Sequence, residues 1–235
     1  MRKPETFYTS NKYLEKNPTW DIEDSPWKAE RVRALLEKAG VEPMRVCEVG
    51  CGAGRVLVSL ATFYSQAAFT GYDIAPTAAK FWKQISNPNI SLYVGDFFTA
   101  DSRKYDLLLL LDVLEHVVDP HDFLMRLKNR SDYFVIHFPL DLSASSVLRE
   151  SSLLYVRRKV GHIHYFTKGL ALELLGECGF EVIDWQYTGA AFTAPQARFK
   201  TRLAQWPRRL VYALGKDIGV RLLGGETLMV LARSK

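Results

Sequence analysis

Cysteine is scarce in this sequence, with only 3 cysteines among 235 residues. An odd, sparse set is typical of a protein in a reducing compartment and argues against a disulfide scaffold. No second cysteine or histidine cluster stands near Cys47 and Cys51 at a spacing that would complete a metal site. We therefore interpret Cys47, Cys51 and Cys178 as small buried packing residues.

The sequence also has no long apolar run, internal repeat or low-complexity tract. Its longest apolar runs, such as Leu107–Leu111, are far shorter than the about 20 residues of a membrane-spanning helix. The N-terminal stretch MRKPETFYTS has no apolar core like that of a secretory signal. With 48% hydrophobic and 24% charged residues, the composition is that of an ordinary globular protein. We expect a soluble, cytoplasmic, single-domain protein.

Short apolar runs alternate with amphipathic stretches along most of the chain, which is typical of βαβ units and a parallel sheet. Asp106–Leu111 is apolar after its first residue, as expected for a central strand covered on both faces. The predicted strands are Arg45–Val49, Ala68–Asp73, Ile90–Val94, Asp106–Leu111, Asp132–His137, Phe180–Tyr187 and Glu226–Ala232. The predicted helices are Ser25–Lys38, Arg55–Tyr64, Ala75–Ile85, Pro120–Lys128 and Thr167–Cys178.

Two segments do not follow this alternation. Residues 1–24 are polar and rich in aromatics, and we expect them to form a lid over a site at the carboxyl edge of the sheet. Residues 188–225 form an insertion before the last strand. Its basic residues interleave with apolar ones, which favours peripheral contact with an anionic membrane surface, although a solvated outer face of a lid is the alternative. They are Arg198, Lys200, Arg202, Arg208, Arg209, Lys216 and Arg221, with Asp217 as the only acid between 196 and 221.

A glycine-rich turn follows the first predicted strand. Glu48 is followed by Gly50, Gly52 and Gly54 in an E-x-G-x-G-x-G pattern. Glycines allow close backbone approach to a ligand, and the N–H groups at a helix start face that ligand. The spacing fits neither the dinucleotide fingerprint G-x-G-x-x-G nor the phosphate loop. A turn of this kind can also serve packing alone.

Two acids follow the next two predicted strands. Asp73 ends the second strand and Asp96 follows the third. Because the carboxyl ends of parallel strands share one edge of a sheet, both acids should border the crevice at the glycine turn. A carboxylate can accept hydrogen bonds from two hydroxyls. The residues alone thus predict a crevice that reads a polar, hydroxylated ligand.

The turn resembles motif I of the class I S-adenosylmethionine (SAM) methyltransferases. Two further motifs match at Gly71-Tyr-Asp73 and Val94-Gly95-Asp96-Phe97, and Asp112-Val-Leu-Glu115-His116-Val117 resembles the D-x-L-E-H-V signature of the small-molecule branch. The resemblance covers residues 45–187 and returns at the last strand. It implies a Rossmann-like, doubly wound, seven-stranded and mostly parallel sheet with an antiparallel last strand. It also implies SAM as the cofactor and S-adenosylhomocysteine as the product. In this resemblance Asp73 receives the ribose hydroxyls, Asp96 takes the adenine amino group and Phe97 flanks the ring, within a cofactor set of Glu48, Gly50, Gly52, Gly54, Asp73, Ile74, Asp96, Phe97 and Asp112.

Three histidines are candidate general bases: His116, His162 and His164. The SAM sulfonium already activates the methyl group, so a base is needed only when the acceptor arrives protonated. Histidine titrates near neutral pH and suits a phenol or sugar hydroxyl. His162 and His164 alternate, so in an extended segment both could face the cleft. Each histidine can instead have a structural role.

A divalent metal is the alternative use of these residues. Asp112, Glu115 and His116, with His162 or His164, offer carboxylates and imidazoles that suit a cation. RNA 3′-end 2′-O-methyltransferases and ubiquinone-pathway O-methyltransferases carry a similar acid-x-x-E-H cluster that holds metal. The later histidines do not match that pattern clearly, and the sequence favours a site without metal.

The function predicted is in-line methyl transfer to oxygen on a small-molecule or lipid- or carrier-linked acceptor. The alternatives are N- or C-methylation and a SAM-binding module without catalysis. The N/D-P-P-Y/F motif of nucleobase amine methylation is absent at Leu111–Leu114, so no nucleic-acid partner is expected. We expect the segment His137–Leu140 to border the acceptor pocket, with Trp20, Trp27 and Tyr165 as an aromatic rim.

Overall fold

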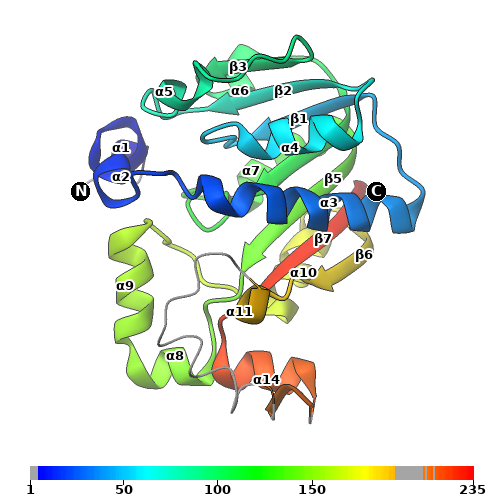
Figure 1. Ribbon diagram of the computed structural model, residues 1–235. Helices are drawn as coiled ribbons and strands as arrows, with labels where there is room; N and C mark the ends of the chain where they lie inside the picture. Colours follow the sequence, from blue (N-terminus) through cyan, green and yellow to red (C-terminus); the bar gives the residue numbers. More distant parts are fainter. Residues whose placement is uncertain (1–4, 194–208, 210, 214) are drawn as a thin grey trace.

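The computed structural model describes residues 5–193, 209, 211–213 and 215–235. A seven-stranded sheet in the order β3-β2-β1-β4-β5-β7-β6 runs through the protein (Figure 1). All neighbouring strands from β3 to β5 are parallel, whereas β7 is antiparallel to both β5 and β6. The strands are β1 Arg45–Val49, β2 Ala68–Asp73, β3 Ile90–Val94, β4 Tyr105–Leu111, β5 Ser131–Pro139, β6 Phe180–Tyr187 and β7 Thr227–Ser234. The predicted topology, including the antiparallel last strand, is confirmed.

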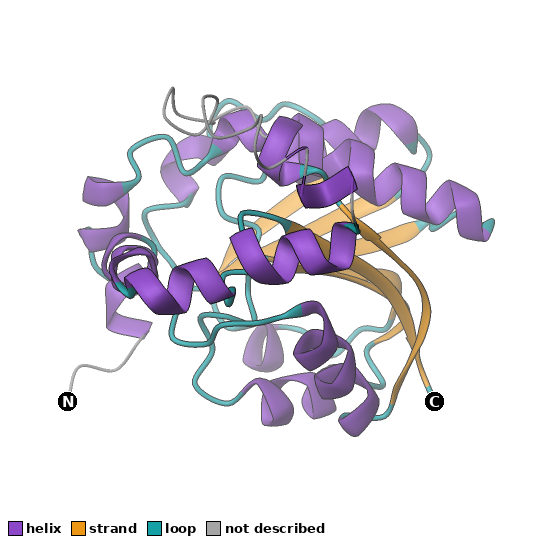
Figure 2. Ribbon diagram, turned by 90° about the horizontal axis from the view of Figure 1, so that it is seen from below, coloured by secondary structure: helices purple, strands orange, loops and turns teal. Residues whose placement is uncertain are grey.

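Helices cover both faces of the sheet (Figure 2). One face packs against α3 (Ser25–Ala39) and α4 (Arg55–Phe63), and the other against α7 (Pro120–Leu127) and α10 (Lys168–Glu177). The remaining helices are α1 Glu5–Thr9, α2 Lys12–Lys16, α5 Ala79–Trp82, α6 Phe97–Ala100, α8 Ala144–Arg149, α9 Ser151–Lys159, α11 Ala190–Thr193 and α14 Lys216–Leu223, with a 3₁₀ turn at Ile22–Asp24.

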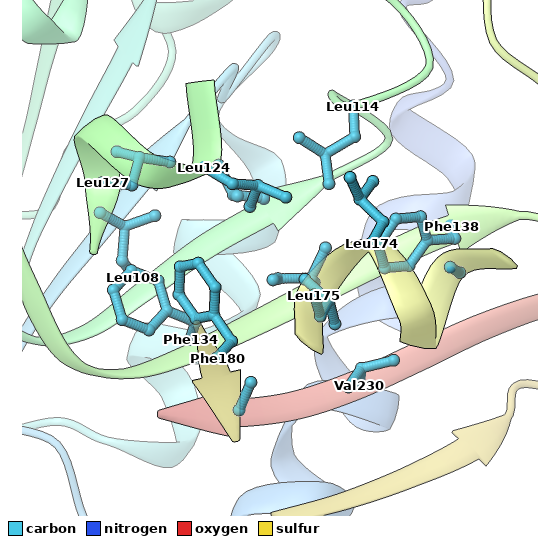
Figure 3. Close-up of a cluster of buried hydrophobic side chains, with 14 of the residues drawn as sticks. Leu108, Leu114, Leu124, Leu127, Phe134, Phe138, Leu174, Leu175, Phe180 and Val230 are labelled. Carbon is cyan, nitrogen blue, oxygen red and sulfur yellow. The ribbon is translucent and has the colours of Figure 1, made fainter. Parts of the chain in front are cut away.

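The central strand β4 divides the core between the two faces. Leu108 and Leu110 belong to the cluster formed with α7 and α10, whereas Leu107 and Leu109 belong to the cluster formed with α3 and α4. Successive residues of a strand point to opposite faces, so an unbroken apolar run is what a doubly covered strand needs. Figure 3 shows the first cluster, with Leu108 among phenylalanines of neighbouring strands and leucines of α7 and α10.

Two helical regions differ from the sequence-based expectation. The predicted helix Ala75–Ile85 shrinks to α5, because the Asp73 carboxylate takes the Ala75 N–H and Pro76 follows, which turns the chain before a helix can begin. The helices α8 and α9 were not predicted. They are separated at Glu150, whose φ of +48° breaks the helical path.

The described part of the N-terminal segment lies at the carboxyl edge of the parallel strands. The N-terminal cap, residues 5–24, contacts the loops after β1 and β4: the Tyr8 hydroxyl lies 2.6 Å from His116 Nδ1, and Trp20 packs against Gly52. Of the predicted insertion, Arg198, Lys200, Arg202 and Arg208 lie outside the described residues, and its role stays a prediction. None of the helices described is both long and apolar enough to cross a bilayer.

Candidate active site

A cavity of about 920 Å³ lies where the parallel strands end beneath the N-terminal cap. The glycine turn and the acids after β2 and β3 line one end, and residues after β4 and β5 line the other. Trp20, Trp27, His137 and Pro139 also line it, and that these residues border the acceptor stays a prediction. Tyr165 does not belong to the described lining, because its hydroxyl points away to donate to the Leu153 carbonyl.

The glycine turn adopts a backbone that side chains would obstruct. Gly50, Gly52 and Gly54 have φ values of +78°, +50° and +71°. A Cβ added at Gly50 would lie 2.7 Å from Cγ2 of Val113 in the loop after β4. The close packing of this loop against the turn therefore requires glycine, in addition to the left-handed conformation.

Asp73 closes this turn. Its carboxylate accepts from the Gly52 N–H at 2.7 Å and from the Ala75 N–H at 2.8 Å. It is almost fully buried, and burial raises its pKa although both backbone N–H groups oppose the shift. Since each carboxylate oxygen has two acceptor positions, hydroxyls of a ligand can still be received from the cavity side.

Glu48 is the other buried acid at the glycine turn. It lines the cavity from the end of β1, and its Oε2 has no hydrogen-bond partner among the described residues. Burial raises its pKa to about 8. An unpartnered buried carboxylate is costly, so a polar ligand that donates to it would be stabilised here. The glycine cradle, the two acids and the cavity volume together fit a nucleoside-bearing cofactor such as SAM.

The three residues Asp96, Phe97 and Phe98 after β3 differ in how they face the cavity and the core. Asp96 caps α6 by accepting from the Phe98 N–H at 3.0 Å, and it lines the cavity. Phe97 is 2% exposed and packs into the core beside Tyr72, and it is also among the residues that line the cavity. Its neighbour Phe98 lines the cavity too, with the Arg126 guanidinium 3.8 Å from its ring centroid. The expectation that Phe97 flanks an adenine ring stays a prediction.

Asp112 begins a chain of polar contacts that crosses the cavity floor. Its carboxylate binds Lys28 Nζ at 2.6 Å and His137 Nδ1 at 2.6 Å, and His137 Nε2 lies 2.7 Å from the Thr227 hydroxyl. His137 and Lys28 hold the pKa of Asp112 well below its usual range despite burial. Asp112 has a φ of +57°, a strained conformation that this network supports.

Glu115, His116 and His162 form a second cluster from which Asp112 is absent. Glu115 Oε1 lies 3.8 Å from His116 Nε2 and 3.9 Å from His162 Nε2. Glu115 is fully buried, and neither of its carboxylate oxygens has a hydrogen-bond partner in the described chain. Burial raises the pKa of Glu115 well above its usual range, with the Asp112 charge acting in the same direction. Burial also lowers the pKa of His116 to about 3, helped by His162 and opposed by the Gly161 carbonyl.

Each imidazole of this cluster is oriented through its other nitrogen. The Tyr8 hydroxyl lies 2.6 Å from His116 Nδ1, and Asp141 Oδ2 lies 2.6 Å from His162 Nδ1. Glu115, His116 and His162 offer one ligand atom each within 4.8 Å of one another. This arrangement suits either a proton acceptor or a divalent cation.

The sequence matches the family described as "Methyltransferase domain" over residues 23–184. This chain is a member of the class I SAM-dependent methyltransferase family. It is 32% identical over 95 residues to trans-aconitate 2-methyltransferase of Streptomyces coelicolor, covering 37% of this chain and 31% of that protein. It is 31% identical over 100 residues to ubiquinone biosynthesis O-methyltransferase of Glaesserella parasuis, covering 38% and 42%. The chain thus matches less than half the length of either relative.

Solved structures share the fold of this methyltransferase. Magnesium protoporphyrin IX methyltransferase from Synechocystis, with bound S-adenosylhomocysteine (SAH), superposes with a TM-score of 0.65 at 18% identity, covering 98% of both chains. The plantazolicin methyltransferase BpumL, also in complex with SAH, superposes with a TM-score of 0.65 at 15% identity, covering 99% of this chain and 95% of that one.

The structure separates the predicted histidines of the methyltransferase. His116 and His162 lie together and line the cavity. His164 does not join them, because its Nε2 lies 2.9 Å from the Val117 carbonyl, outside the described cavity lining. The segment from 161 to 167 is not a strand, so strict alternation of side chains fails there. His164 is therefore removed from the candidate bases.

Sequence reasoning missed the residues that contact His116, Asp112 and His162. Tyr8, Lys28 and Asp141 lie in three separate parts of the chain, and no local pattern marks them. His137 carried a signal, since it ends a predicted strand at the sheet edge where ligands bind.

Proposed function

We propose that this methyltransferase transfers the SAM methyl group to an oxygen atom of a small acceptor. The observation that carries the proposal is the buried, unpartnered Glu115 carboxylate facing two imidazole nitrogens at the cavity. A hydroxyl acceptor arrives protonated and needs a proton acceptor such as one of these imidazoles, whereas a neutral amine does not. The lowered pKa of His116 keeps its ring neutral at physiological pH, so one ring nitrogen carries a free lone pair.

The chain's residues divide the work between the two ends of the cavity. Glu48, Asp73 and Asp96 would hold the cofactor beside the glycine turn, and bound SAM would supply an electrophilic methyl group on its sulfonium. At the other end, His116 Nε2 takes the hydroxyl proton from the acceptor. The N-terminal cap and Trp27 exclude water and orient the acceptor oxygen for in-line attack.

A lipid- or carrier-linked acceptor is supported by the surface beyond the cap. Val147, Leu148 and Tyr155 on α8 and α9 are exposed, and Leu148 is 87% exposed. Arg157 and Arg158 lie on the same helix as Tyr155. Basic and apolar side chains on neighbouring helices suit an anionic membrane surface, where an acyl-linked substrate would be delivered.

A second candidate is cation-assisted methylation, which the geometry favours more than the sequence pattern did. Glu115, His116 and His162 would hold the ion, and a divalent cation supplies Lewis acidity that lowers the pKa of a hydroxyl. The unpartnered Glu115 carboxylate fits such an ion. Dialysis against a chelator distinguishes the two: lost turnover that Mg²⁺, Mn²⁺ or Zn²⁺ restores favours the cation, and unchanged turnover favours the histidine base.

The test uses SAM with a labelled methyl group and matched acceptor pairs, such as a catechol and the corresponding aminophenol. We expect label on oxygen, with S-adenosylhomocysteine formed in equal amount. Label on nitrogen or carbon would contradict oxygen transfer. Tight SAM binding without turnover on a broad acceptor panel would instead indicate a binding module.

A further inference from the structure

We propose that Tyr8, in the N-terminal cap, is a positioning residue that fixes the tautomer of His116. With the cap seated, His116 carries its proton on Nδ1 and presents the Nε2 lone pair to Glu115 and the cavity. The catalytic consequence of this proposal rests on the proposed function, whereas the tautomer itself does not.

The tautomer of His116 follows from the hydrogen-bond donors and acceptors around the Tyr8 hydroxyl. Tyr8 Oη lies 2.6 Å from the Val160 carbonyl oxygen and 2.6 Å from His116 Nδ1. A carbonyl can only accept, so the single Tyr8 hydrogen points to Val160. Tyr8 Oη is then left as an acceptor, and His116 Nδ1 must donate to it. A phenol keeps its proton at physiological pH, so this single hydrogen is present.

The neighbouring histidines provide internal references. His162 Nδ1 faces the Asp141 carboxylate at 2.6 Å, which accepts, so His162 is also protonated on Nδ1. His164 Nε2 faces the Val117 carbonyl at 2.9 Å, so His164 has the opposite tautomer. His116 is the member of this group whose Nδ1 partner comes from the N-terminal cap.

The consequence for the site is that two lone pairs converge. His116 Nε2 and His162 Nε2 lie 3.8 Å and 3.9 Å from Glu115 Oε1, with their Nδ1 protons directed away. A proton acceptor or a cation ligand both require a free lone pair at this position. If His116 carried its proton on Nε2, neither role would be available. When the N-terminal cap is in place, it therefore leaves His116 Nε2 free to accept a proton or bind a cation, and it also encloses the cavity.

The Tyr8 ring is held by packing that does not need its hydroxyl. It contacts the rings of Phe7, Tyr13 and His116 at centroid distances of 5.3, 5.2 and 5.2 Å. Tyr8→Phe therefore keeps the aromatic contacts and removes one oxygen. Tyr13→Phe is the matched control, because Tyr13 lies in the same aromatic cluster but its hydroxyl faces Asp21.

The test is ¹⁵N NMR of histidine-labelled full-length protein without cofactor, with long-range couplings identifying the protonated nitrogen of each ring. In the wild type we expect Nδ1–H for His116 and His162 and Nε2–H for His164. Nε2–H for His116 in the wild type would overturn the proposal, whatever the variants do.

In Tyr8→Phe we expect His116 to gain Nε2–H while His162 stays unchanged, and in Tyr13→Phe we expect the wild-type pattern. An unchanged His116 tautomer in Tyr8→Phe would contradict the role of Tyr8, provided that contacts between the rings at positions 8 and 13 persist. The proposed function fails separately, if His116→Ala leaves turnover intact.

Discussion

The two ends of the cavity are built in different ways. The cofactor end takes its backbone cradle and its first acid from one stretch, residues 48–54, and adds an acid from the end of each of the next two strands. The histidine end takes Tyr8 from the N-terminal cap, Lys28 from α3, and Asp141 and His162 from segments on either side of α8 and α9. A short-range motif thus shapes the cofactor end, whereas tertiary packing assembles the histidine end.

The buried acids at the two ends also differ in their hydrogen bonding. Asp73 satisfies its carboxylate through backbone N–H groups of its own neighbourhood. The Glu115 carboxyl group has no such partner in the described chain, and Glu115 is held through its backbone carbonyl, which accepts from the Ile163 N–H at 2.8 Å. The cofactor end should therefore tolerate changes at the histidine end, and each can be tested separately by mutation.

The largest expected effect is on turnover. We expect His116→Ala to lower kcat by about a hundred- to ten-thousand-fold, because the variant lacks the group that accepts the hydroxyl proton. Affinity for S-adenosylhomocysteine should stay within about twofold, since His116 lies at the other end of the cavity. His121→Ala is the control, as His121 is exposed on α7 and contacts Glu177. An equal loss of affinity and turnover would contradict the separation of the two ends.

A smaller effect is expected on stability from Lys28→Met. Removing Lys28 leaves the partly buried Asp112 carboxylate with His137 as its remaining side-chain partner among the described residues, at an expected cost of about 2 kcal/mol in the free energy of unfolding. Lys38→Met, on the same helix, removes an exposed pair with Asp184 and should cost less than about 1 kcal/mol. Denaturant unfolding measures the free energy of unfolding of both variants. Equal losses would show that the Lys28–Asp112 pair stabilises the protein no more than an exposed ion pair does.

Features formed by neighbouring residues could be predicted from the sequence, whereas contacts between distant residues could not. The strand bounds of β1, β2, β3 and β6 follow directly from apolar runs, because a strand buried in a sheet needs consecutive or alternating apolar residues. The pairing of Asp112 with Lys28 joins residues 84 positions apart, and nothing local in the sequence encodes it. His164 was grouped with His162 on alternation, which fails in a segment that is not a strand.

A further expected effect is a change in the pH dependence of the free energy of unfolding. In the cofactor-free protein the pKa of Glu48 is about 8, above its ordinary value of 4.5, so the folded state keeps a proton that the unfolded state loses. The free energy of unfolding should therefore fall as pH rises from about 4.5 to 8, by at most roughly 1.4 kcal/mol per pH unit for this group. Glu48→Gln should make the free energy of unfolding less dependent on pH, by the contribution of Glu48. Glu115 also has a raised pKa, so part of the pH dependence should persist in Glu48→Gln, and Glu115→Gln should remove that part. If Glu48→Gln left the slope unchanged, Glu48 would be ionised in the folded protein.

The most direct test of the account is calorimetry of S-adenosylhomocysteine binding to the wild type and to Asp73→Ala. Asp106→Ala is the control, because Asp106 binds Arg45 at the opposite edge of the sheet. We predict binding on the order of micromolar in the wild type and in the control, and at least about tenfold weaker binding in Asp73→Ala. No binding to the wild type would contradict the central claim, and the glycine turn would then serve packing alone.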